Sequence, residues 1–190
     1  MAVSRYDQRK NYEANEANAI GTEYVRVELL APADAARVQA QLKKYTELRI
    51  EFYKTRNRSE LQQINEETAR RQTEMWNAVQ AAALPQATPV MALVVSGMND
   101  VLNSQGYTQA AWWNRIPVAA WALLALTAIG CNILVGYGSK TDQAKSSLLL
   151  VMPLLVAISF LLIADIDSPR GGLIHVAPQN LTAFWDSLQK

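Results

Sequence analysis

Two apolar runs decide the fold: residues 116–137 read IPVAAWALLALTAIGCNILVGY, and residues 146–164 read SSLLLVMPLLVAISFLLIA. Neither run contains a charged side chain. About 20 helical residues cross the hydrocarbon core of a bilayer, roughly 30 Å, so each run can span a membrane. The short segment between them can only join antiparallel neighbours. We therefore predict a transmembrane hairpin over 116–164; the alternative is a buried hairpin in a soluble core, where helices are seldom apolar on every side.

Charge is concentrated away from these runs. Thirteen of the 18 Lys and Arg residues, and twelve of the 17 Asp and Glu residues, lie between positions 5 and 74. The net charge is +1 and the mean hydropathy is −0.04, so the average composition conceals a charged half joined to an apolar half. A balanced charge gives no basic surface, and no nucleic-acid partner is expected.

Residues 1–83 are predicted to form a bundle of three charged helices, because apolar residues recur there at steps of three and four. We expect these helices over about 4–30, 34–57 and 59–83, with Ser59 as the N-cap of the third. One stripe on the second helix contains an arginine among apolar residues: it consists of Val38, Leu42, Tyr45, Arg49 and Phe52.

Residues 84–115 are predicted to be a proline-bearing linker followed by an interfacial or packed helix over 90–102, which is too short to span a bilayer. Trp112 and Trp113 would then mark the headgroup level. Residues 165–190 are predicted to form a C-terminal tail on the same side of the membrane as the helical bundle, because a complete hairpin enters and leaves by one face. The predicted fold class is thus all-α, an integral membrane protein whose partner is the lipid bilayer.

Charged and amide side chains form rows on the first helix. A solvated face is one reading of such rows; the other is a polar lumen formed when several copies surround an axis. The candidate lumen-facing or ion-path residues are Arg5, Arg9, Glu13, Asn15, Glu16 and Asn18.

A second group follows the last apolar run, in the sequence Asp165-Ile-Asp167-Ser-Pro169-Arg170. Asp165 and Asp167 are weak candidates for ligating a hard cation such as Ca²⁺. Alternatively they pair with Arg170, or with Arg5 or Arg9 of the first helix, because carboxylates at a membrane boundary need partners. We treat Asp165, Asp167, Pro169 and Arg170 as a candidate structural motif.

No catalytic arrangement is visible, because His175 is the only histidine and no phosphate-binding or zinc motif occurs. We therefore expect neither an enzyme nor a bound cofactor.

Several motifs together resemble one family. They are RYDQRKNYEANEANAIGTEYVRVELL at 5–30, Tyr45-x-x-x-Arg49, Trp76, Met98-Asn99-Asp100, Arg115-Ile116-Pro117 and DIDSPRGGLIHVAPQNL at 165–181. In this order they resemble the bacterial bestrophin-like membrane proteins over nearly the whole chain. Two features depart from that pattern. Members usually carry two further transmembrane helices before the first motif, and Gln105 and Gln109 occupy the region where an arginine is expected.

The resemblance implies a subunit of an oligomeric ion channel, a pentamer that passes anions such as chloride. It also implies a multi-pass protein of the bacterial inner membrane, with the helical region and the C-terminus in the cytoplasm. The alternative is a non-conducting, membrane-anchored helical scaffold that docks a partner at the cytoplasmic surface.

Overall fold

The computed structural model describes residues 2–85, 88–138 and 150–189. Within these ranges the chain forms helices and no strand, so the all-α prediction is confirmed. The chain divides into two compact units. We call Asp7–Trp113 with Val176–Lys190 the helical unit, and Met1–Tyr6 with Asn114–His175 the apolar unit.

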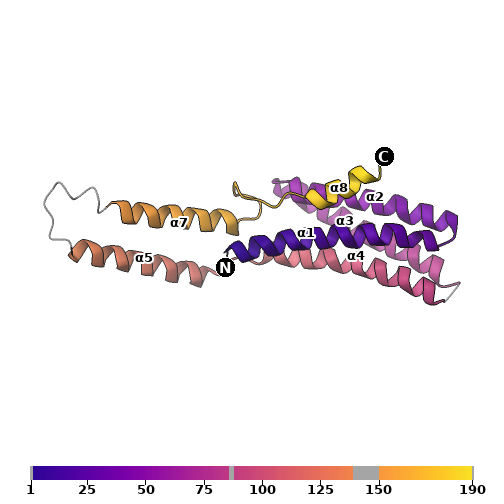
Figure 1. Ribbon diagram of the computed structural model, residues 1–190, viewed down its shortest axis with the longest axis horizontal. Coiled ribbons are helices and arrows are strands. Elements are labelled where there is room, and N and C mark those ends of the chain that lie inside the picture. Colours follow the sequence, from indigo (N-terminus) through magenta and orange to yellow (C-terminus); the bar gives the residue numbers. More distant parts are fainter. Residues whose placement is uncertain (1, 86–87, 139–149, 190) are drawn as a thin grey trace. The chain divides into compact units, whose positions relative to one another are not determined.

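The helical unit is built from long helices that lie along one another, with the short C-terminal helix beside them (Figure 1). These elements are α1 (Ala2–Arg26, whose first residues belong to the apolar unit), η1 (Val27–Leu29), α2 (Pro32–Lys54), α3 (Arg58–Ala83), α4 (Pro89–Trp113) and α8 (Gln179–Ser187).

Local signals set the helix ends. Pro32 occupies the first turn of α2, where its missing N–H costs no hydrogen bond. The N-cap of α3 is Asn57, whose Oδ1 accepts a hydrogen bond from the backbone N–H of Ser59 at 3.0 Å. The prediction of Ser59 as the N-cap was therefore wrong by two positions, because the amide of Asn57 reaches the first turn and satisfies the donor that capping requires.

The core of the helical unit follows the predicted stripe of α2, whose five residues are all fully buried. Next to it an aromatic cluster joins α2 to α4: the ring centroids of Phe52, Tyr53 and Trp112 lie 5.1–5.5 Å apart, with edge-to-face geometry. Trp112 is thus a core residue of the helical unit, which corrects its predicted place at a lipid headgroup layer. Trp113, by contrast, is 73% exposed.

Helix α4 is longer than the predicted 90–102. It buries Met91, Val94, Met98 and Val101 at helical spacing. It therefore packs within the bundle, so of the two predictions for this segment, an interfacial helix or a packed helix, the packed helix is the one observed. Residues 86–87 of the predicted linker lie outside the described residues. The predicted tail divides between the units, because residues up to His175 belong to the apolar unit and α8 belongs to the helical unit.

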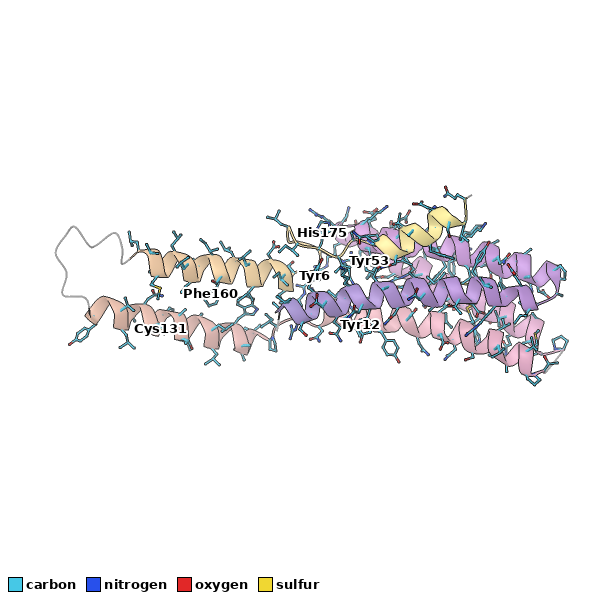
Figure 2. All side chains as sticks on the ribbon, viewed as in Figure 1. Tyr6, Tyr12, Tyr53, Cys131, Phe160 and His175 are labelled. Carbon is cyan, nitrogen blue, oxygen red and sulfur yellow. The ribbon has the colours of Figure 1, made fainter. Side chains whose placement is uncertain are left out.

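The apolar unit contains α5 (Val118–Gly138) and α7 (Val151–Asp167), which lie side by side (Figure 1). Phe160 of α7 lies on the side that faces α5 (Figure 2), and its ring centroid is 6.1 Å from that of Trp121. The predicted connecting segment and the first residues of the second apolar run, 139–149, lie outside the described residues.

Both helices of the apolar unit expose their apolar side chains. No residue of α5 is buried, and in α7 only Asp167 is. By length and composition, one helix among the described residues, within Pro89–Gly138, could cross a membrane. The described part of α7 is shorter, at 17 residues.

Candidate functional site

Helix α1 directs a row of charged side chains into the helical unit. Arg9, Glu13, Glu16 and Glu23 are each at most 2% exposed. Their spacing of four, three and seven residues places them on one helix face. Ionised groups are seldom buried without partners, so these side chains are expected to contact groups that compensate their charge.

Glu16 is the centre of a buried polar cluster that joins three helices. Its carboxylate pairs with the guanidinium of Arg49 on α2. It also accepts hydrogen bonds from the hydroxyl of Tyr53 at 3.3 Å and from the hydroxyl of Thr108 on α4 at 3.0 Å. The Arg49 guanidinium carbon lies 4.2 Å from the ring centroid of Phe52, which adds a cation–π contact.

The charges in this cluster act on the neighbouring titratable groups. Burial, the largest single effect, lowers the pKa of the Arg49 guanidinium, but the charge and hydrogen bond of Glu16 together with Tyr45 and Tyr53 outweigh it, and the pKa is raised. Burial, and then the Glu16 charge, raise the pKa of both Tyr45 and Tyr53. The two phenols therefore stay neutral, and Tyr53 serves as a hydrogen-bond donor. This enclosed cluster fixes α1, α2 and α4 together rather than presenting a reactive group.

Glu13 holds the C-terminal helix. Its Oε1 accepts hydrogen bonds from the backbone N–H groups of Asn180 at 2.9 Å and Leu181 at 3.0 Å, and its Oε2 accepts one from the Asn180 side chain at 2.6 Å. A carboxylate here satisfies otherwise unpaired N–H groups and complements the positive end of the α8 dipole. Arg9 donates from Nε to the backbone oxygen of Ala111 at 3.3 Å, so it helps to hold the end of α4.

The six candidate ion-path residues are thus separated by the fold. Three of them lie buried inside the helical unit, where they form hydrogen bonds or ion pairs: Arg9, Glu13 and Glu16. They are buried because α2, α4 and α8 pack on their side of α1. In this chain they therefore do not form the expected lumen-facing row. Arg5 belongs to the apolar unit. Asn15 and Asn18 are exposed.

Asn15 borders a shallow hollow of about 400 Å³ between α1 and α4. Asp100 and Asn103 of α4 also line it. The rings of Tyr12 and Tyr107 stack beside them with their centroids 6.1 Å apart. The sequence does not predict this grouping, because nothing in either helix alone indicates which faces of α1 and α4 meet.

In the apolar unit, Asp167 joins two separated segments. It accepts a hydrogen bond from Arg5 at 3.2 Å, and both of its oxygens lie 3.1 Å from the backbone nitrogen of Ile116. Of the alternatives considered for Asp167, the structure thus contains an ion pair with Arg5.

Asp165 organises the following turn. It accepts hydrogen bonds from the backbone N–H groups of Ile174 at 2.8 Å and Leu173 at 2.7 Å. Gly172 is needed here, because a Cβ at this position would lie 2.5 Å from the backbone oxygen of Asp165. Pro169 is buried and Arg170 is half-buried. Among the described residues, no group of three or more His, Cys, Asp or Glu side chains is placed to hold a metal ion.

The comparison with protein families decides the assignment. The model of the Bestrophin-like domain matches residues 1–181. The chain belongs to the bestrophin-like family. The family resemblance is therefore confirmed, and family membership together with the apolar helix indicates that this bestrophin-like chain associates with a membrane. No curated protein and no solved structure matches the chain.

Proposed function

We propose that the chain is a subunit of an oligomeric, multi-pass membrane protein that conducts ions, with a preference for anions such as chloride. The single observation that carries the proposal is the bestrophin-like match over residues 1–181. In this proposal α5 and α7 form the transmembrane hairpin in the bacterial inner membrane, and their exposed apolar side chains meet lipid or other subunits. The helical unit and the C-terminus lie in the cytoplasm.

The arrangement of charge on α1 supports an anion preference. Carboxylates lining a lumen would repel anions, but Glu13 and Glu16 are engaged inside the helical unit. The exposed candidates on this helix are the uncharged amides of Asn15 and Asn18. We propose that these two amides face the ion path, where their N–H₂ groups can donate to a passing anion.

Flux measurements from liposomes test this function. The purified chain is reconstituted, chloride and potassium flux are measured, and the number of subunits is determined on the same sample. A pore on a symmetry axis requires a closed ring of subunits. Selective chloride flux from a closed ring is the expected result, and a monomer or dimer without flux would refute the proposal.

Single substitutions then test the proposed path. Asn15→Asp and Asn18→Asp each add a negative charge at nearly constant size, so each should lower chloride flux relative to potassium flux. Asn77→Asp makes the same chemical change on the exposed surface of α3 and serves as the matched control. If all three variants keep the wild-type ratio of the two fluxes, α1 does not line the path.

The second candidate function is a non-conducting anchored scaffold, favoured by a hollow of about 930 Å³ between α3 and α4. Its lining is mainly apolar and includes Trp76, Val79, Met91 and Val95. Apolar hollows of this size are typical of binding sites. Loss of partner binding after Val95→Asp, with folding retained, would support the scaffold; unchanged binding would count against it.

A further inference from the structure

Glu23 differs from the other buried charges on α1 because it lacks hydrogen-bond partners. Its side chain is 0% exposed, and neither carboxylate oxygen has a partner among the described residues. Glu13 and Glu16, on the same face, accept hydrogen bonds from at least two other residues each. An ionised carboxylate in such a place loses its hydration without compensation, whereas the protonated form does not carry that penalty.

The carboxylate of Glu23 rests directly on α4 at Gly97. A Cβ built on Gly97 would lie 1.9 Å from Oε2 of Glu23 and 2.7 Å from Nη1 of Arg26. A larger residue at position 97 would therefore displace the buried end of Glu23 and the guanidinium of Arg26. The guanidinium of Arg26 shares the same space above Gly97, yet no salt bridge joins it to Glu23 within the described residues.

We propose that Glu23 is a proton-binding site that controls the contact between α1 and α4. With the proton bound, the neutral carboxyl packs on Gly97 and the two helices stay in close contact. When the proton leaves, the carboxylate must attract Arg26 or water, and either change opens the contact at Gly97.

The charged groups that act on Glu23 come from both helices. Burial raises its pKa to about 8, Arg26 on α1 lowers it, and Asp100 on α4 raises it. Relative to the ordinary value of 4.5, the folded protein binds this proton roughly 10³-fold more tightly than the unfolded chain does. Stability supplied by the bound proton is thus complete below about pH 4.5 and is lost progressively as the pH rises to about 8.

Protonation of Glu23 would also affect the proposed ion path, and this consequence rests on the proposed function. Asn15 and Asn18 lie on α1, so a change in how α1 packs on α4 would move both amides. The proton-binding site itself is independent of conduction and is tested without measuring flux.

Infrared difference spectroscopy on the full chain in detergent tests the proposal. Spectra are taken from about pH 6 to about pH 10, a range in which ordinary carboxyl groups are already ionised. The wild type should show a protonated carboxyl band that disappears with a midpoint near pH 8. Glu23→Gln should lack the band, and Glu28→Gln, at an exposed position nearby, should retain it.

Thermal unfolding of the same samples provides a second readout. Glutamine imitates the protonated carboxyl, so Glu23→Gln and the wild type should unfold at similar temperatures near pH 4.5. The variant should become progressively more stable than the wild type up to about pH 8, with no further divergence above it. Absence of the carboxyl band from the wild type, or an unfolding difference that does not change with pH, would overturn the proposal.

Discussion

Replacing Arg49 with leucine tests whether the polar cluster at Glu16 is as enclosed as the structure indicates. Both side chains of the ion pair are 0% exposed. Arg49→Leu keeps a bulky side chain but leaves the Glu16 carboxylate, among the described residues, with the hydroxyl groups of Tyr53 and Thr108 as its hydrogen-bond donors. Removing one partner of a buried pair costs about 3–5 kcal/mol, because the remaining charge is neither hydrated nor neutralised. We expect the free energy of unfolding to fall by that amount.

The double variant Glu16→Gln with Arg49→Leu separates this cause from simple loss of packing. The glutamine carbonyl can still accept from the two hydroxyl groups, while the uncompensated charge is gone. We therefore expect the double variant to regain about 2 kcal/mol relative to Arg49→Leu alone. Arg70→Leu provides the matched control, since Arg70 pairs with Glu67 on the exposed surface of α3 and its loss should change stability little.

The assay is urea unfolding of the detergent-solubilised chain, followed by helical circular dichroism, with the midpoint and slope fitted for each variant. The reasoning is refuted if Arg49→Leu is as mild as Arg70→Leu. It is also refuted if adding Glu16→Gln destabilises Arg49→Leu further, because the carboxylate would then not be the penalised group.

Three further predictions concern single contacts. Gly97→Ala should destabilise the helical unit, because its Cβ would lie 1.9 Å from a buried carboxylate oxygen; Gly106→Ala, with nothing within 4 Å, should stabilise α4 by about 0.5–1 kcal/mol. Equal shifts in the unfolding midpoints of these two variants would contradict the close contact. Glu13→Ala should cost at least about 1 kcal/mol, as for loss of an N-cap, and α8 should lose hydrogen-exchange protection before the other helices; unchanged protection would argue against the cap. Asp165→Asn should weaken both hydrogen bonds to the following turn, so exchange of the Leu173 and Ile174 amides should accelerate while exchange in α8 stays the same.

Apolar periodicity was sufficient to predict the first three helices of the bundle, α1, α2 and α3, but not the full length of α4 or the helix α8. The stripe of α2 lies in the core as its spacing indicates, and the predicted ends of α1, α2 and α3 lie within a few residues of the observed ones. Helix α4, by contrast, continues to Trp113, well past the predicted end at residue 102. The predicted start of α3 differs from the observed one because Asn57 and Ser59 both have side-chain oxygens that can accept a hydrogen bond from the first turn. The two residues lie two positions apart, and the sequence does not indicate which of them is the N-cap.

Periodicity was not sufficient to orient α1. Charged residues at helical spacing fit a solvated face, a lumen or an internal network equally well, and only the partner helices distinguish these cases. The signal that could have distinguished them is Arg49, an arginine within an otherwise apolar stripe of α2. A buried arginine requires a buried acceptor, and Glu16 supplies it across 33 positions of sequence.

The contact between Glu13 and the start of α8 has a consequence for biosynthesis. Its partners Asn180 and Leu181 follow Glu13 by 167 and 168 residues, and both apolar runs lie between them and are made first. The helical unit is therefore completed only when the residues that follow His175 emerge. Until α8 has been made, the Glu13 carboxylate of a nascent chain lacks the N–H groups that it binds in the finished unit. A ribosome-stalled chain that ends at residue 175 should therefore be recognised by proteases and chaperones as incompletely folded.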